Sequence, residues 1–112
     1  LVELCDGGEV DVVLTTGGTG LTPRDVTPEA TRAVIEREAP GISEALRVGA
    51  LGRFPRAALS RGIAGVRGKT LLVNLPGSPG GVKDGIAVLG QWLAHAVDLV
   101  RGEHTTHERA DT

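Results

Sequence analysis

The chain has 112 residues, 40% hydrophobic and 23% charged, which is the composition of one globular domain, or part of one, with a modest core. A formal net charge of −2 and only two aromatic residues, Phe54 and Trp92, argue against a nucleic-acid partner. The apolar runs are too short to span a bilayer and no signal-peptide pattern opens the chain, so we expect a cytoplasmic protein without a membrane partner. Cys5, the single cysteine, is expected to be a small buried hydrophobe.

The first four residues have the pattern expected at the end of a helix, not at its beginning. Leu1-Val2-Glu3-Leu4 resembles the last turn of an amphipathic helix, and the chain contains no Met. We therefore expect an N-terminal segment of the native protein to be absent from this sequence. Residues 1–5 are predicted to form a helix end that stops at Asp6-Gly7-Gly8, and the apolar residues 10–15 are predicted to form a buried strand.

A glycine-rich segment follows this strand, with the sequence Thr15-Thr16-Gly17-Gly18-Thr19-Gly20. Its glycines permit a tight turn with positive φ and leave backbone N–H groups uncovered, which suits a bound anion such as phosphate. The carboxyl ends of strands are also where open α/β sheets bind ligands. A loop that merely has to bend is the alternative.

Two other nucleotide-binding loops are disfavoured by spacing. The glycine-rich segment does not fit Gly-x-Gly-x-x-Gly, which argues against a dinucleotide fold. Gly68-Lys69-Thr70 resembles the end of a P-loop, but an apolar, strand-like run follows it where a P-loop requires a helix.

Asp25 stands five residues beyond Gly20, at the expected rim of the glycine-rich loop. Its carboxylate could hold Mg²⁺ against a phosphate or accept a hydrogen bond from a polar ring. Thr27-Pro28-Glu29 then predicts a helix start, with Thr as N-cap and Pro in the first position, and this helix is expected to run to Pro40-Gly41. A second helix is predicted over residues 42–51.

From residue 57 the apolar pattern changes to that of strands. Residues 59–66 and 69–75 predict two strands joined at Arg67-Gly68 as a hairpin. A second loop follows, Leu75-Pro76-Gly77-Ser78-Pro79-Gly80-Gly81, and leads into a long helix predicted over residues 82–100. Two glycine loops after two strands imply a shared crevice.

Helices before and after the strands predict an α/β fold with three layers, α/β/α, built on a mostly parallel sheet plus the short β-hairpin. Residues 1–102 are expected to form this domain, and residues 103–112 a polar C-terminal tail. His104 and His107 lie in the tail without a convincing third ligand, so we favour a polar tail over a metal site.

Four separated motifs together resemble the MogA/MoaB family of molybdenum cofactor biosynthesis proteins, which includes the G domain of gephyrin. They are the glycine-rich loop, Arg24-Asp25-Val26-Thr27-Pro28-Glu29-Ala30, Leu59-Ser60-Arg61 and Asn74-Leu75-Pro76-Gly77-Ser78-Pro79, and they cover nearly the whole chain in the family's order. Family members usually have further residues ahead of Leu1, including another strand and an acidic position near the site.

The resemblance implies molybdopterin adenylyltransferase activity, in which molybdopterin and ATP, with Mg²⁺, give adenylylated molybdopterin and pyrophosphate. It implies a homo-oligomer, a trimer or a hexamer, with a molybdotransferase as a candidate partner. The family's acidic residue matches Asp25 and its serine matches Ser60, so both are expected to be catalytic; our hypothesis is that Asp25 orients the pterin or binds Mg²⁺. Substrate and phosphate binding is assigned to Thr16, Gly17, Gly18, Thr19, Gly20, Arg61, Asn74, Pro76, Gly77 and Ser78.

Two alternatives stay open at the level of sequence. The chain could be a catalytically silent MoaB-type paralogue that binds molybdopterin as a carrier or scaffold. A competence-damage or molybdotransferase domain fits the motif around Asp25 less well.

Overall fold

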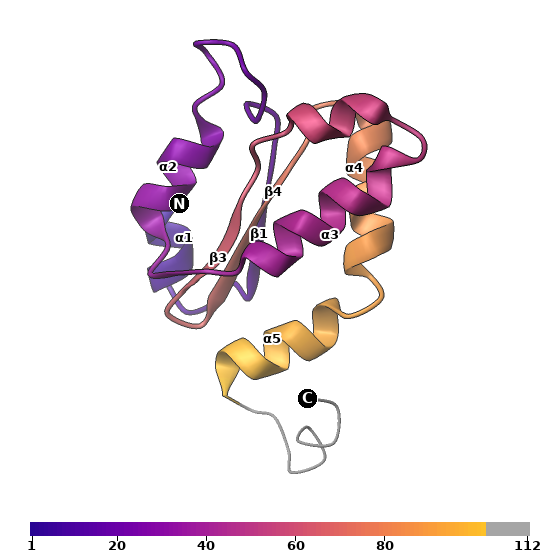
Figure 1. Ribbon diagram of the computed structural model, residues 1–112. Helices are drawn as coiled ribbons and strands as arrows, with labels where there is room; N and C mark the ends of the chain where they lie inside the picture. The colour runs from indigo at the N-terminus through magenta and orange to yellow at the C-terminus, as the bar shows by residue number, and fades with distance from the viewer. Residues whose placement is uncertain (103–112) are drawn as a thin grey trace.

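The computed structural model describes residues 1–102, and the tail predicted for residues 103–112 lies outside this range. Helices cover both faces of a central sheet (Figure 1). In chain order the elements are α1 (Val2–Asp6), β1 (Val12–Thr16), α2 (Thr27–Val34), β2 (Arg37–Glu38), α3 (Pro40–Leu51), the 3-10 helix η1 (Pro55–Leu59), β3 (Ala64–Arg67), β4 (Thr70–Leu75), α4 (Pro79–Leu89) and α5 (Leu93–Arg101).

The sheet has the strand order β1-β4-β3-β2. Strand β1 pairs parallel with β4, whereas the β4–β3 and β3–β2 pairs are antiparallel. The α/β class and the hairpin are confirmed, but the described sheet is mixed and not mostly parallel. The reason is that β3 and β4 are joined by a two-residue turn with Gly68 at φ +57°, and so short a connection can only join antiparallel strands.

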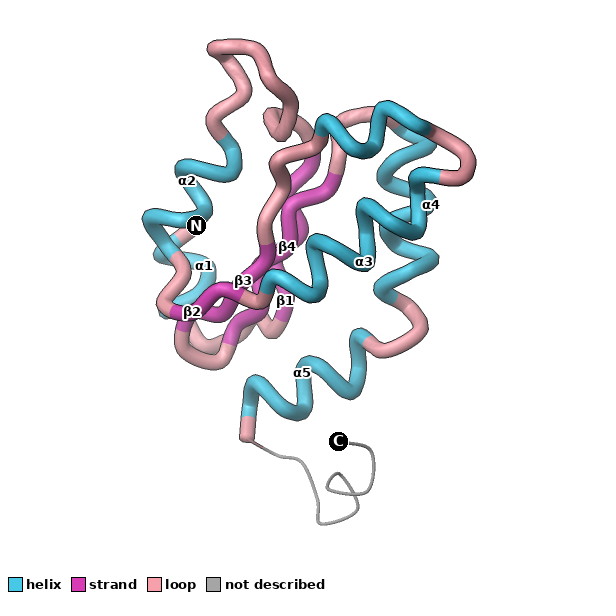
Figure 2. Tube along the Cα trace, viewed as in Figure 1, coloured by secondary structure: helices cyan, strands magenta, loops and turns pink. Residues whose placement is uncertain are grey.

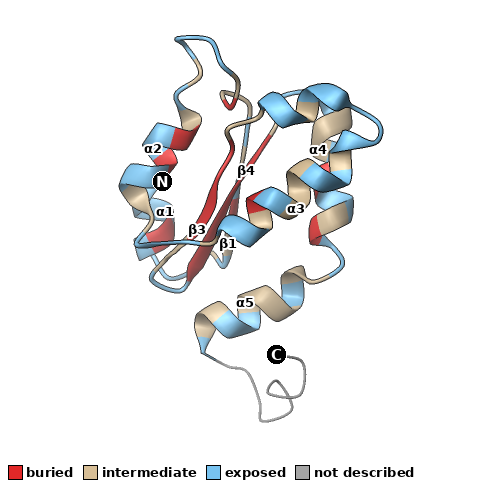
Figure 3. Cartoon of the chain, in the orientation of Figure 1, coloured by how far each residue is buried: buried red, intermediate tan, exposed pale blue. Residues whose placement is uncertain are grey.

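Strand β4 is the centre of the molecule, because all six of its residues are buried (Figure 3). Successive side chains of a strand point to opposite faces of its sheet. Leu71, Val73 and Leu75 pack with Leu89 in a core beneath α3, α4 and α5. Leu72 packs with Cys5 and Val13 in a second core beneath α1 and α2, which confirms the buried position expected for Cys5.

Two helix predictions were too long. The helix predicted over residues 82–100 is two helices, since α4 ends at Leu89 and α5 begins at Leu93. Gly90 closes α4, and the turn that follows carries Trp92 back onto the core beneath α3 and α4.

The helix expected to reach Pro40 ends at Val34 instead. Ile35 is extended, and Glu36 N–H donates to the Val66 carbonyl at 2.8 Å, so this segment joins the sheet edge as β2 (Figure 2). Tertiary pairing with β3 thus overrides a locally helical pattern.

None of the helices within residues 1–102 combines the length and apolar character needed to cross a membrane.

Candidate functional site

The two glycine loops meet at one edge of the sheet. Strands β1 and β4 are parallel neighbours, with Thr16 in register with Leu75, so their carboxyl ends lie side by side. Gly17 N–H donates to the Leu75 carbonyl at 3.0 Å, and a Cβ added to Gly77 would lie 3.1 Å from Gly17 Cα. The two loops are therefore neighbours in the fold, and the crevice predicted between them stays a prediction.

The first loop requires glycine for steric reasons. Gly17 and Gly18 have φ of +86° and +72°, a region that residues with a Cβ rarely occupy. A Cβ on Gly18 would lie 2.1 Å from Thr27 Oγ1, and Thr27 N–H donates to the Gly18 carbonyl at 3.1 Å. The loop is thus folded tightly against the first residue of α2.

Asp25 lies half-buried at the rim of this loop. Its Oδ2 accepts hydrogen bonds from Thr22 N–H at 3.0 Å and Thr22 Oγ1 at 2.8 Å. These bonds to the Thr22 side chain and backbone lower the pKa of Asp25, so the carboxylate is ionised at neutral pH. Its other oxygen, Oδ1, takes part in neither bond.

The guanidinium of Arg61 binds the segment that follows the glycine loop. Nε donates to the Gly20 carbonyl at 2.7 Å, Nη2 donates to the Asp25 carbonyl, and Nη1 and Nη2 bind the Glu29 carboxylate at 2.5 and 3.3 Å. The Arg61 backbone N–H also donates to the Thr19 carbonyl at 2.7 Å. Arg61 therefore holds the loop and the start of α2 together.

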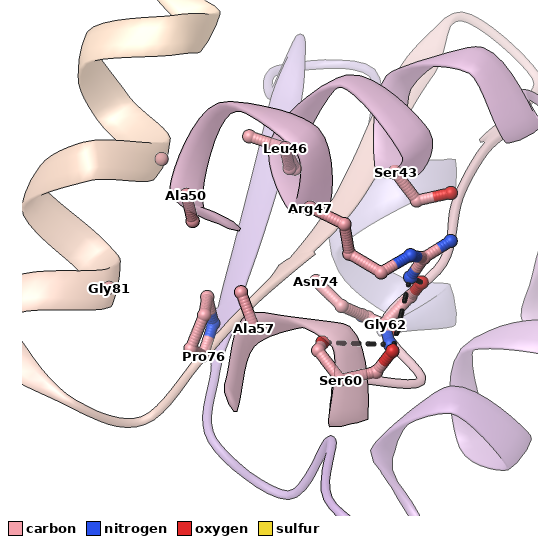
Figure 4. A pocket seen from close by; sticks show the side chains of 11 residues that line it. Ser43, Leu46, Arg47, Ala50, Ala57, Ser60, Gly62, Asn74, Pro76 and Gly81 are labelled. Atoms are coloured by element: carbon pink, nitrogen blue, oxygen red, sulfur yellow. Dashed lines mark hydrogen bonds between the residues drawn. The ribbon is translucent and has the colours of Figure 1, made fainter. Parts of the chain in front are cut away.

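Ser60 lies directly after η1, beside a small pocket of about 40 Å³ (Figure 4). Its Oγ accepts a hydrogen bond from Gly62 N–H at 3.2 Å. The pocket is also lined by Asn74 of β4, by Pro76 just after this strand and by Arg47 of α3. Sequence reasoning did not find Arg47; the available signal was a single basic residue in an otherwise largely apolar predicted helix.

Asn74 is only 4% exposed and its side chain is bonded on three sides. Oδ1 accepts from Ile63 N–H at 3.1 Å, while Nδ2 donates to Thr15 Oγ1 at 2.8 Å and Thr31 Oγ1 at 2.9 Å. The motif that contains Asn74 was predicted to bind ligand. The Asn74 amide ties β4 to β1, to α2 and to the irregular segment that precedes β3, and its role in ligand binding stays a prediction. Sequence reasoning missed Thr15 and Thr31 as its partners.

The second loop leads directly into α4. Ser78 is its N-cap, and Ser78 Oγ accepts from Gly81 N–H at 3.1 Å. Gly77 and Ser78 are exposed, as is Thr16 at the end of β1, whereas Thr19 is 6% exposed. Thr16, Gly77 and Ser78 are thus the predicted residues exposed at the sheet edge, whereas the side chains of Arg61 and Asn74 are hydrogen-bonded within the protein.

Asp25 has the chemistry that a Mg²⁺ site requires, since Mg²⁺ is commonly held by one or two carboxylates together with substrate phosphates. Among residues 1–102, no group of three or more His, Cys, Asp and Glu side chains gathers to hold a metal ion.

The amino-acid sequence is similar to those of known molybdopterin adenylyltransferases. The chain is 41% identical over 104 residues to the molybdopterin adenylyltransferase of Helicobacter pylori strain J99, covering 93% of this chain and 59% of that protein. It is 49% identical over 84 residues to the molybdopterin adenylyltransferase of Escherichia coli K12, covering 75% and 43%. The chain therefore spans well under two thirds of the length of these relatives.

Solved structures agree with the sequence relatives. The molybdopterin biosynthesis Mog protein from Mycobacterium ulcerans superposes with a TM-score of 0.82 at 49% identity, covering 86% of this chain and 63% of that one. The molybdopterin biosynthesis enzyme MoaB from Thermus thermophilus also gives 0.82, at 52% identity, covering 89% and 63%. Residues 2–95 match the model of the MoCF_biosynth family, described as a probable molybdopterin binding domain, and the chain belongs to this family.

Proposed function

We propose that the protein carrying this chain is a molybdopterin adenylyltransferase, which transfers AMP from ATP to the terminal phosphate of molybdopterin. The observation that supports this most is the contact between the two glycine loops, with the ionised Asp25 beside one of them and Ser60 on the adjoining segment. Two glycine loops that meet at one sheet edge suit a reaction in which two phosphate groups must meet.

The reaction asks mainly for positioning and charge stabilisation. A phosphate oxygen of molybdopterin attacks the α-phosphorus of ATP, a new P–O bond forms there, and the bond to the bridging oxygen breaks to release pyrophosphate. In our proposal Thr16, Gly17, Gly18, Thr19 and Gly20 hold one substrate at the first loop. Pro76, Gly77 and Ser78 hold the other at the start of α4, where helix N–H groups favour an anion.

Two side chains are proposed to act directly. The hydroxyl of Ser60 accepts from Gly62 N–H, which leaves its own hydrogen free to donate to a phosphate oxygen. Asp25 would orient the pterin or bind Mg²⁺, which would neutralise charge on the phosphate oxygens when bound. Arg61 was expected to contact phosphate; since its nitrogens already donate to Gly20, Asp25 and Glu29, we propose that it supports the site by holding the first loop.

We further propose that the protein assembles as a homo-oligomer, a trimer in preference to a hexamer. An open, largely apolar groove between α3 and α5, lined in part by Ile42, Trp92 and Leu99, supports an assembly surface there. A molybdotransferase partner and a cytoplasmic location stay predictions. The mass of the protein in solution would test the assembly.

The proposed activity is tested by measuring pyrophosphate release from Mg-ATP, with and without molybdopterin, using the complete protein. We expect release that depends on molybdopterin and falls at least tenfold in Ser60→Ala and in Asp25→Asn, which corresponds to about 1.4 kcal/mol of barrier. Arg24→Gln is the control beside Asp25.

Two results would count against parts of this proposal. If the wild type binds molybdopterin but releases no pyrophosphate, the protein is a silent pterin-binding paralogue. If Asp25→Asn keeps full activity with unchanged Mg²⁺ dependence, Asp25 has no role in metal binding.

A further inference from the structure

Arg47 reaches from α3 to the segment that carries Ser60 (Figure 4). Its Nη1 donates to the Gly62 carbonyl at 2.9 Å and to the Ser60 carbonyl at 3.3 Å. One nitrogen of a helix residue thus binds two carbonyls that flank Arg61 in a segment without regular structure.

Because this segment is partly buried, the loss of the Arg47 hydrogen bonds would be costly. Gly62 is buried, and a buried carbonyl that loses its donor is costly because water cannot easily replace the bond. Space nearby is confined as well, since a Cβ on Gly62 would lie 3.3 Å from the Asn74 Cβ and 3.4 Å from Ser60 Oγ. The Ser60–Gly62 backbone therefore has little freedom while Arg47 is bound.

The same backbone determines where the Ser60 hydroxyl lies. Gly62 N–H donates to Ser60 Oγ, so the residue whose carbonyl Arg47 binds is also the residue whose amide holds the hydroxyl. On the other side, Arg61 N–H donates to the Thr19 carbonyl of the glycine loop. The segment is therefore held between α3 and the first loop.

We propose that Arg47 is a positioning residue of the site: by holding the Ser60 and Gly62 carbonyls, it orients the Ser60 hydroxyl toward phosphate without contacting the reacting atoms. This inference rests on the adenylyltransferase function proposed above. It assigns a role to a residue of α3, a helix that contributes none of the motifs of the two loops.

The test is a double-mutant cycle in the complete protein. Arg47→Met removes the donors and keeps most of the side chain's length, Arg47→Lys keeps one cationic donor, and Arg47→Met is also made with Ser60→Ala. Arg32→Met is the matched control, because Arg32 is an exposed arginine that pairs with Glu38 away from Ser60. Each variant is measured for pyrophosphate release with Mg-ATP and molybdopterin, and for hydrogen exchange at the Gly62 and Ile63 amides.

We expect Arg47→Met to lower kcat by about tenfold with KM within about twofold, and Arg47→Lys to restore part of the loss. In the Ser60→Ala background the same change should alter kcat by less than about twofold, because the hydroxyl it positions is gone. The Gly62 amide should exchange faster in Arg47→Met, while the amides of the β3–β4 hairpin stay unchanged.

Three outcomes would overturn the role of Arg47. These are an unchanged kcat in Arg47→Met, losses that multiply between Arg47→Met and Ser60→Ala, or a raised KM with unchanged kcat, which would mean that Arg47 binds substrate itself. If the wild type releases no pyrophosphate, the proposed function fails, and hydrogen exchange then decides about Arg47. Unchanged exchange at Gly62 would refute the contact, whereas faster exchange would support it.

Discussion

The Arg61 side chain holds the chain between the glycine loop and α2 in place. The guanidinium of Arg61 binds Gly20, Asp25 and Glu29, so one side chain links the end of the glycine loop to the first turn of α2. Glu29 is the charged partner in this contact, and it lies in the first turn of α2, where a negative charge also favours the helix.

The contact between Arg61 and Glu29 predicts a pH dependence. The side-chain hydrogen bond from Arg61 lowers the pKa of Glu29, so the stabilisation is present above the unfolded-state pKa, about 4.3, and is lost as the pH falls through the folded-state value. We expect Glu29→Gln to lower the urea midpoint at pH 7 and to lower it less as the pH falls below about 4.3.

The control for this prediction is Glu44→Gln, at an exposed position of α3. Its effect on the urea midpoint should be small and should be the same at pH 7 and below about pH 4.3. An equal effect of Glu29→Gln at both pH values would show that the ionised carboxylate contributes nothing to the contact.

At the scale of elements, the edge strand β2 shows how packing decides a local structure. Only two residues form it, and its flanking bonds run from Glu36 N–H to Val66 and from Ala39 N–H to Ala64, both at 2.8 Å. Gly65 of β3 makes room for it. A Cβ there would lie 2.6 Å from the Arg37 carbonyl oxygen and 2.6 Å from Ile35 Cδ1.

We therefore expect Gly65→Ala to displace β2 and to lower the free energy of unfolding by about 2 kcal/mol. Urea unfolding measures the loss, and hydrogen exchange should be faster at the Glu36 and Ala39 amides. Gly41→Ala is the matched control, because nothing lies within 4 Å of a Cβ at Gly41 in the first turn of α3. That change should be neutral or stabilising, by about 0.5 kcal/mol. A Gly65→Ala protein as stable as the control would contradict this account of β2.

At the scale of the whole molecule, Asn74 connects parts of the chain that are distant in sequence. Its amide binds the side chains of Thr15 and Thr31 and the Ile63 backbone, joining both sides of the central strand β4 at its carboxyl end. This is also the end where the two glycine loops meet, so the stability of the fold and the shape of the site depend on the same residue.

We expect Asn74→Ala to lower the free energy of unfolding by about 3 kcal/mol, because it removes three hydrogen bonds and leaves their buried partners unsatisfied. Thr31→Val, which loses one of these bonds while keeping the volume of the side chain, should cost about 1 kcal/mol. Urea unfolding measures both. A loss in Asn74→Ala no greater than that in Thr31→Val would mean that the network does not act as a unit.

Much of this protein was predictable from sequence because the signals are local. The chain must turn at Gly17 and Gly18, and again at the proline-glycine loop that follows a hydrophobic strand. The hairpin turn at Gly68 is equally local, because only two residues connect its strands. Periodicity located most helices, and four separated motifs pointed to the family to which the chain belongs.

The remaining features depend on contacts between distant residues, which a local pattern does not contain. Whether residues 35–39 continue a helix or join an edge strand was decided by pairing with β3, and Trp92 packing on the core accompanies the break between α4 and α5. The hydrogen bonds of Arg61 and Asn74 inside the protein are contacts of this kind. Their residue types suit ligand binding, but in the folded chain Arg61 binds Glu29, 32 residues away, and Asn74 binds Thr31 and Thr15, 43 and 59 residues away. These partners satisfy the polar groups inside the protein.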